Sequence, residues 1–172
     1  QDVIDNYEGS VYIVWGLQDW NVDPYHAFPT YRMLNDAGVH TRVISGQWAH
    51  NYPDQPEIHG GLTSGYGEEA YPNMSRMDWA IEMWNWFEYY LKGNGEEPAA
   101  HAQMQTHDGR WHVEETWPPE DMEWTMMDVS PLDSNGGMSV SATSSLTVTS
   151  PPMEEDLHIQ GMPTFHVRAS TG

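Results

Sequence analysis

An acidic residue and a histidine each follow a short apolar run. Asp19 lies within residues 16–22 (GLQDWNV), and His50 ends residues 46–50 (GQWAH). Open α/β sheets place their sites at the carboxyl ends of such runs. A carboxylate that accepts a hydrogen bond from one imidazole nitrogen fixes the tautomer, so the other nitrogen can take a proton from a serine hydroxyl. The pattern therefore predicts Asp19 and His50 as the acid and the base of a catalytic triad.

The serine of such a triad is not present in a recognisable motif. In α/β-hydrolases the chain order is Ser, Asp, His, and the serine occupies a G-x-S-x-G elbow. The nearest imitation is residues 61–65 (GLTSG), where Ser64 has the wrong spacing and follows the histidine. We therefore expect the nucleophile to lie upstream of Gln1. The alternative interpretation is that Asp19 caps a turn and His50 is an ordinary loop histidine.

Periodicity indicates the elements that position this pair. Residues 11–15 (VYIVW) and 41–45 (TRVIS) each predict a buried strand of a parallel sheet, closed by a glycine. Residues 25–37 predict a helix that stops at Gly38, with Pro29 limiting or distorting its first turns. A strand, a helix and a strand in this order form a βαβ unit.

A long loop and a second helix are expected next. Residues 51–73 lack clear periodicity and predict a loop or a lid-like excursion. Residues 75–92 predict a helix ended by Gly93. Ser75 and Asp78 match a capping box at its start. The expected buried face consists of apolar residues at helical spacing, which are Trp79, Met83, Trp86, Phe87 and Tyr90.

The pattern changes to short strands after a linker-like NGEEP segment. Residues 102–106 and 111–115 flank an Asp-Gly pair and predict a hairpin. More strands are expected at residues 124–129, 139–141, 145–149 and 164–169. The sequence therefore predicts an α/β unit over residues 1–97 and an incomplete, sandwich-like β-domain over residues 98–172.

Composition excludes several classes of function. The 172 residues include 26 acidic and six basic ones, for a formal net charge of −20, and Lys92 is the only lysine. Scattered acid of this kind is typical of proteins from high-salt organisms. Nucleic acid and anionic membranes require a basic surface, so neither is expected as a partner. The absence of cysteine excludes disulfides and thiolate chemistry, and cytoplasmic and secreted locations both stay open.

Other patterns point less clearly to chemistry. The D-x-N-x-D run that begins at Asp19 imitates an EF-hand loop. Pro24 and Thr30 stand where that loop needs glycine and glutamate. The nine histidines form no H-E-x-x-H pair, so no metal or organic cofactor is expected. Trp20 and Trp48 neighbour the predicted catalytic residues, and each either contacts substrate or packs beneath the site.

Several segments together carry a family resemblance. In order they are IVWGLQDWNV, QWAH, MDWAIEMWNWFEYYLKGNGEEP and HDGRWHVEETWPP. They resemble the Xaa-Pro dipeptidyl-peptidase and cocaine-esterase-like serine hydrolases, over about residues 9–169. That family has an α/β-hydrolase core followed by a C-terminal jelly-roll β-domain. The chain departs from it in lacking the serine and the oxyanion-hole segment and in having a truncated jelly roll.

The resemblance implies the C-terminal part of a serine hydrolase that works through an acyl-enzyme. Asp19 and His50 match the family's triad positions. The implied substrates are Xaa-Pro dipeptides or small-molecule esters and amides, and homo-oligomer formation stays open. The alternative from another class is a noncatalytic β-domain module that binds carbohydrate or protein, which the aromatic-rich second half favours.

Overall fold

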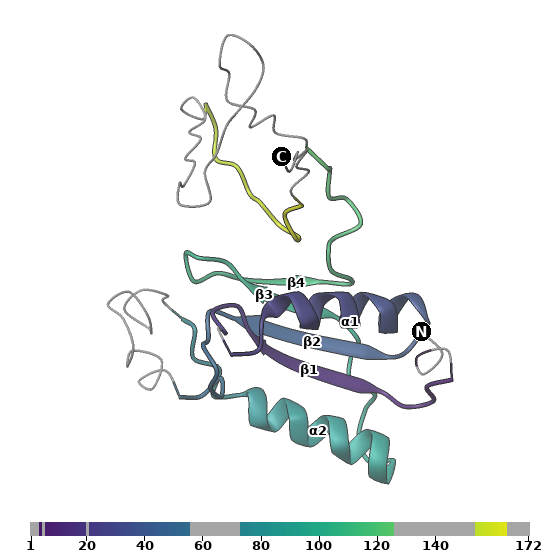
Figure 1. Cartoon of the computed structure of the whole chain (residues 1–172). Helices are drawn as coiled ribbons and strands as arrows, with labels where there is room; N and C mark the ends of the chain where they lie inside the picture. Colours follow the sequence, from purple (N-terminus) through teal and green to yellow (C-terminus); the bar gives the residue numbers. More distant parts are fainter. Residues whose placement is uncertain (1–3, 5, 20, 56–72, 126–153, 165–172) are drawn as a thin grey trace, which may run out of the picture. The chain divides into compact units, whose positions relative to one another are not determined.

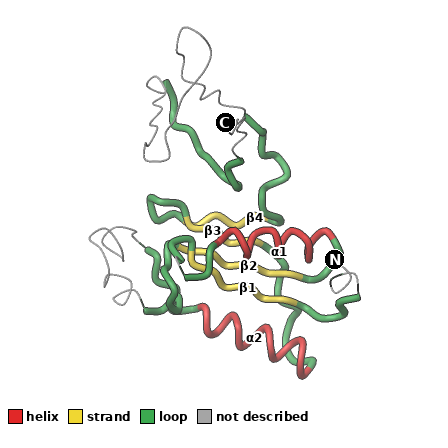
Figure 2. Tube along the Cα trace, viewed as in Figure 1, coloured by secondary structure: helices red, strands yellow, loops and turns green. Residues whose placement is uncertain are grey.

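The computed structural model describes residues 4, 6–19, 21–55, 73–125 and 154–164. Within them the fold is mixed α/β, with one four-stranded sheet and two helices (Figure 1; Figure 2). The elements in chain order are β1 (Val11–Gly16), α1 (Pro24–Asp36), β2 (Thr41–Gly46), α2 (Trp79–Lys92), β3 (Ala102–Gln105) and β4 (Trp111–Glu114). The predicted α/β class is confirmed.

The βαβ unit is formed as predicted. β1 and β2 pair in parallel, with a register that runs from Val11 opposite Thr41 to Gly16 opposite Gly46. All six residues of β2 are buried, as expected for a strand with neighbours on both sides. The two strands therefore end at the same edge of the sheet.

α1 begins with a side-chain cap and continues through its proline. The Oδ1 atom of Asp23 accepts a hydrogen bond from the Tyr25 amide at 2.8 Å. The helix does not break at Pro29, which loses only one backbone hydrogen bond while an apolar face stays packed. The buried residues of that face are Ala27, Phe28, Tyr31 and Leu34. Gly38, at φ 76°, follows the helix end as predicted.

α2 starts later than predicted. Its first residue is Trp79, and its N-cap, Asp78, makes no side-chain capping bond. The capping-box prediction is wrong because both carboxylate oxygens of Asp78 bind Arg76 instead. Gly93 ends the helix in the left-handed conformation, at φ 71°. Trp86 is buried, whereas Phe87 of the predicted buried face is 49% exposed.

The hairpin is confirmed, but the predicted domain boundary after residue 97 does not match the structure. β3 and β4 pair antiparallel, and β3 also pairs in parallel with β2, so one sheet continues past Pro98. The second edge of the buried β2 needs hydrogen-bond partners, and β3 supplies them. The chain instead divides into compact units after Pro119.

The other predicted strands of the β-domain lie largely or wholly outside the described residues. Residues 139–141 and 145–149 lie outside completely, as do residues 126–129 and 165–169 of the other two predicted strands. Residues 120–125 and 154–164, which are described, contain no strand. Of the predicted loop, residues 56–72 are also outside, and Ser64 with them. Among the described residues, no helix has the length and apolar character needed to cross a membrane.

Candidate active site

The site lies where β1 and β2 end side by side. Beyond the strands, the Leu17 amide donates to the Gly46 carbonyl at 2.8 Å and the Gln18 amide to the Trp48 carbonyl at 2.9 Å. The two loops therefore continue next to each other past the edge of the sheet. This backbone pairing brings Asp19 and His50 to the same place.

A glycine permits this close approach. A Cβ atom on Gly16 would lie 2.4 Å from the Trp48 carbonyl oxygen and 2.7 Å from that of Ala49. Both obstructing atoms are backbone, which cannot rotate away as a side chain can. Only glycine therefore lets the end of β1 lie against the loop that carries His50.

Asp19 and His50 are hydrogen-bonded. The Nδ1 atom of His50 lies 3.0 Å from Oδ2 of Asp19. The Oδ1 atom of Asp19 accepts from the amides of Asn21 and Val22, each at 2.9 Å. An ionised carboxylate can only accept, so neutral His50 carries its proton on Nδ1 and has Nε2 available as a proton acceptor.

The side chains of Asp19 and His50 differ in their exposure to solvent, and this difference suits different roles. The side chain of Asp19 is 10% exposed, and that of His50 is 55% exposed. A fixed, nearly buried carboxylate suits an orienting group, whereas an accessible imidazole can meet a reactant. Burial raises the pKa of Asp19, but the hydrogen bonds from Val22, His50 and Asn21 outweigh this and leave the pKa below its usual value. Asp19 is therefore ionised near neutral pH.

The two tryptophan predictions have different outcomes. Trp20 lies outside the described residues. Trp48 is 1% exposed, belongs to a core cluster with Ile44 and Met74, and donates from Nε1 to the Met74 carbonyl at 2.7 Å. Packing beneath the site, the second of the two alternatives, accounts for the position of Trp48.

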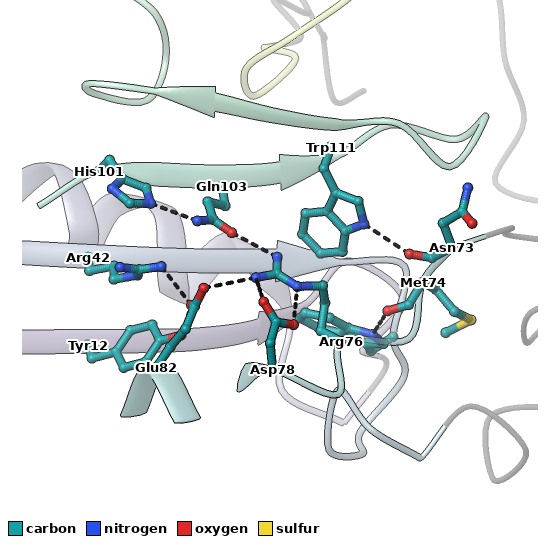
Figure 3. A network of polar contacts seen from close by, with 11 residues as sticks. Tyr12, Arg42, Asn73, Met74, Arg76, Asp78, Glu82, His101, Gln103 and Trp111 are labelled. Atoms are coloured by element: carbon teal, nitrogen blue, oxygen red, sulfur yellow. Dashed lines mark hydrogen bonds and ion pairs between the residues drawn. The ribbon is translucent and has the colours of Figure 1, made fainter. Parts of the chain in front are cut away.

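A polar network around Arg76 anchors the segment whose Met74 carbonyl accepts the hydrogen bond from Trp48 (Figure 3). Arg76 binds both carboxylate oxygens of Asp78 at 2.8 Å, Gln103 Oε1 at 2.7 Å and Glu82 Oε1 at 3.1 Å. Its guanidinium also lies over the Trp111 ring, 4.7 Å from the centroid. One arginine therefore joins the start of α2 to β3 and β4.

The network continues to the first two strands. Glu82 of α2 accepts from Arg42 of β2 at 2.6 Å and from the Tyr12 hydroxyl of β1 at 3.1 Å (Figure 3). Burial, together with the nearby Glu82 carboxylate, raises the pKa of Tyr12 well above its usual value. Tyr12 therefore remains a hydrogen-bond donor at any ordinary pH. These contacts attach α2 across the sheet behind the site.

The D-x-N-x-D run from Asp19 to Asp23, which imitates a calcium-binding loop, has a structural role in the described residues. Asp19 fixes the loop after β1, and Asp23 caps α1. Across the part of the chain that is described, no three histidine or acidic side chains gather as a metal ion would require. The chemistry that the arrangement itself offers is proton transfer by an oriented imidazole.

Comparison with known proteins identifies no relative. No family model, no curated protein and no solved structure matches the chain. The function must therefore be inferred from the geometry of the site and from the resemblance carried by its motifs.

Proposed function

We propose that the chain supplies the acid and the base of a serine hydrolase that acts through an acyl-enzyme. The observation that carries this proposal is the hydrogen bond of 3.0 Å between Asp19 and His50 at the carboxyl edge of parallel strands. Acid after one strand and histidine after the next is the order that α/β-hydrolases use. The exposed imidazole of His50, backed by a carboxylate with 10% side-chain exposure, supports the same assignment.

Each residue has one role in the proposed mechanism. Asp19 holds His50 in the Nδ1–H tautomer and stabilises the imidazolium that forms. His50 takes the proton from a serine hydroxyl as the hydroxyl attacks a carbonyl carbon, and later gives that proton to the leaving group. The serine and the oxyanion-hole donors come from residues upstream of Gln1.

The proposed substrates follow from the motif resemblance. They are peptides with a penultimate proline, from which a dipeptide is released, or esters and amides of small acids. In this proposal the described sheet is the last part of an α/β-hydrolase fold, and the residues after it belong to a jelly-roll domain. The βαβ unit with the acid and the base at its edge supports the hydrolase part.

The test uses the full-length protein that contains this chain. Hydrolysis of a p-nitrophenyl ester and of an Xaa-Pro p-nitroanilide is measured for wild type, Asp19→Asn and His50→Ala. We expect kcat to fall by roughly 10⁴-fold or more in either variant, because the imidazole loses its orientation or is removed. Full activity in both variants would refute the assignment.

Matched controls separate chemistry from folding. Asp23→Asn changes a carboxylate in the same loop region but preserves an N-cap, so activity should be retained. His107→Ala removes an exposed histidine of the β3–β4 turn and should also leave activity unchanged. A fluorophosphonate label should attach to a serine outside residues 1–172. A label on Ser64 would place the nucleophile within this chain instead.

A further inference from the structure

Three glutamine side chains join the carboxyl ends of three neighbouring strands. The Nε2 atom of Gln18 donates to Oε1 of Gln47 at 2.9 Å, and Nε2 of Gln47 donates to the Gln105 carbonyl at 3.2 Å. Oε1 of Gln105 accepts from the backbone N–H of Gln47 at 3.1 Å. We call Gln18, Gln47 and Gln105 the amide ladder. It extends from the loop after β1 to the end of β3.

The ladder lies beside the Asp19–His50 pair in the sequence and in the fold. Gln18 immediately precedes Asp19, and Gln47 begins the loop that leads to His50. An amide has both a donor and an acceptor, so Gln47 can bind one neighbour on each side with a single side chain. A charged or purely apolar side chain of this size could not make both contacts.

Burial makes these contacts hard to exchange for water. Gln47 is 7% exposed and Gln105 is 3% exposed. A buried amide that loses its partners destabilises the fold by the full desolvation penalty of its polar groups. Small separations of the loops would therefore leave buried polar groups unpaired. The ladder therefore restrains the spacing of the two loops in addition to the backbone contacts at Leu17 and Gln18.

We propose that Gln47 is a positioning residue of the site. Its side chain holds the Asp19 loop against the His50 loop and thereby keeps neutral His50 in the Nδ1–H tautomer. The consequence for catalysis rests on the proposed hydrolase function. The positional effect on the imidazole does not, because it concerns only the hydrogen bond between Asp19 and His50.

The test substitutes Gln47→Met, which keeps the approximate length of the side chain and removes both hydrogen-bonding groups. The tautomer of neutral His50 is read from the ¹⁵N shifts of its imidazole, and kcat and KM are measured with the ester substrate. We expect a shift toward the Nε2–H tautomer that free histidine prefers. We also expect kcat to fall by about tenfold to a hundredfold at little change in KM, because small displacements of catalytic groups have effects of this size.

Two further variants keep the test decisive. Gln103→Met makes the same change in β3, where Gln103 binds Arg76 and His101 rather than either loop. Arg76 keeps its carboxylate partners there, so this control should lower thermal stability without shifting the tautomer. If Gln47→Met does not fold, Gln18→Met removes only the hydrogen bond from the Asp19 loop to Gln47, leaves the bonds between Gln47 and Gln105 in place, and should give the same tautomer shift.

The outcomes separate this inference from the proposed function. A wild-type His50 in the Nε2–H tautomer would overturn the inference. An unchanged tautomer in Gln47→Met, together with a lower melting temperature, would also overturn it, since Gln47 would then only support the core. If Gln47→Met shifts the tautomer but the wild-type protein hydrolyses neither substrate, the positioning role stands and the hydrolase proposal fails.

Discussion

The two carboxylate oxygens of Asp19 have different partners, and this division governs its titration. One oxygen accepts from backbone amides and the other from His50. Backbone amides cannot lose their protons, so they favour the ionised carboxylate at every pH. The pKa of Asp19 is lowered although burial acts in the opposite direction.

The lowered pKa leads to a pH prediction. A folded pKa below the unfolded value, which is about 3.9, means that ionised Asp19 stabilises the fold above that pH. This contribution is lost as pH falls through the folded pKa. We expect the difference in unfolding free energy between wild type and Asp19→Asn to be largest near pH 6 and to shrink below about pH 4. Urea unfolding at pH 6 and at pH 3 measures it, and a difference that is constant with pH would contradict this account.

An experiment can distinguish the two interpretations of Trp48, which are contact with substrate and packing beneath the site. Trp48→Phe removes the donor to the Met74 carbonyl and leaves space in the core. We expect a loss of about 1–3 kcal/mol in unfolding free energy with no change in KM. The measurements are urea unfolding and steady-state kinetics of the full-length protein. A raised KM at full stability would instead identify Trp48 as a substrate contact.

At the scale of elements, the end of β1 decides whether the two loops can meet. Gly16→Ala places a Cβ atom 2.4 Å from the Trp48 carbonyl oxygen, so the segment that leads to His50 must move. We expect a loss of about 1–3 kcal/mol in unfolding free energy, the usual cost of overpacking, together with loss of hydrolysis. Urea unfolding and the ester assay test both effects.

Gly95→Ala is the control for this glycine. In the part of the chain that the structure describes, no heavy atom beyond its two chain neighbours lies within 4 Å of its added Cβ, although φ is +85°. This variant should therefore lose stability through backbone strain alone and keep its activity. Equal activity in Gly16→Ala and Gly95→Ala would show that the close approach at Gly16 does not position the site.

For the whole molecule, the excess of negative charge dominates the electrostatics. The formal net charge is −20, and the chain has six lysine and arginine residues. Within the described residues, four of these cations pair with carboxylates, and they are Arg42, Arg76, Lys92 and Arg110. Most of the acidic residues have no cation to offset them, because the chain has 26 aspartates and glutamates.

Screening of this repulsion should therefore stabilise the fold. The Debye length falls from about 10 Å at 0.1 M salt to about 3 Å at 1 M. We expect the melting temperature to rise by roughly 5 °C or more over this range, which corresponds to about 1–2 kcal/mol for a chain of this size. Calorimetry in NaCl measures the rise, and a matched series in sucrose controls for general solute effects. A melting temperature that does not depend on salt would refute adaptation to high salt.

The sequence alone determined the parts of the structure that depend on local pattern. β1, α1, β2 and the β3–β4 hairpin follow from apolar runs, glycine stops and an Asp-Gly turn. The proximity of Asp19 and His50 also follows, because parallel strands joined by a helix end at one edge of the sheet. Each of these predictions needs information from only a few neighbouring residues or from one connection.

Only the tertiary structure decided the features that depend on distant partners. A strand's apolar pattern shows that it is buried, but not which strand completes its second edge, and β3 binds β2 across the predicted boundary at Pro98. α2 has apolar residues on more than one face, and the ion pairs of Glu82 with Arg42 and Arg76 turn Phe87 outward. The amide ladder was missed for the same reason. Gln47 and Gln105 are 58 residues apart, and a glutamine carries no local signal of its partner.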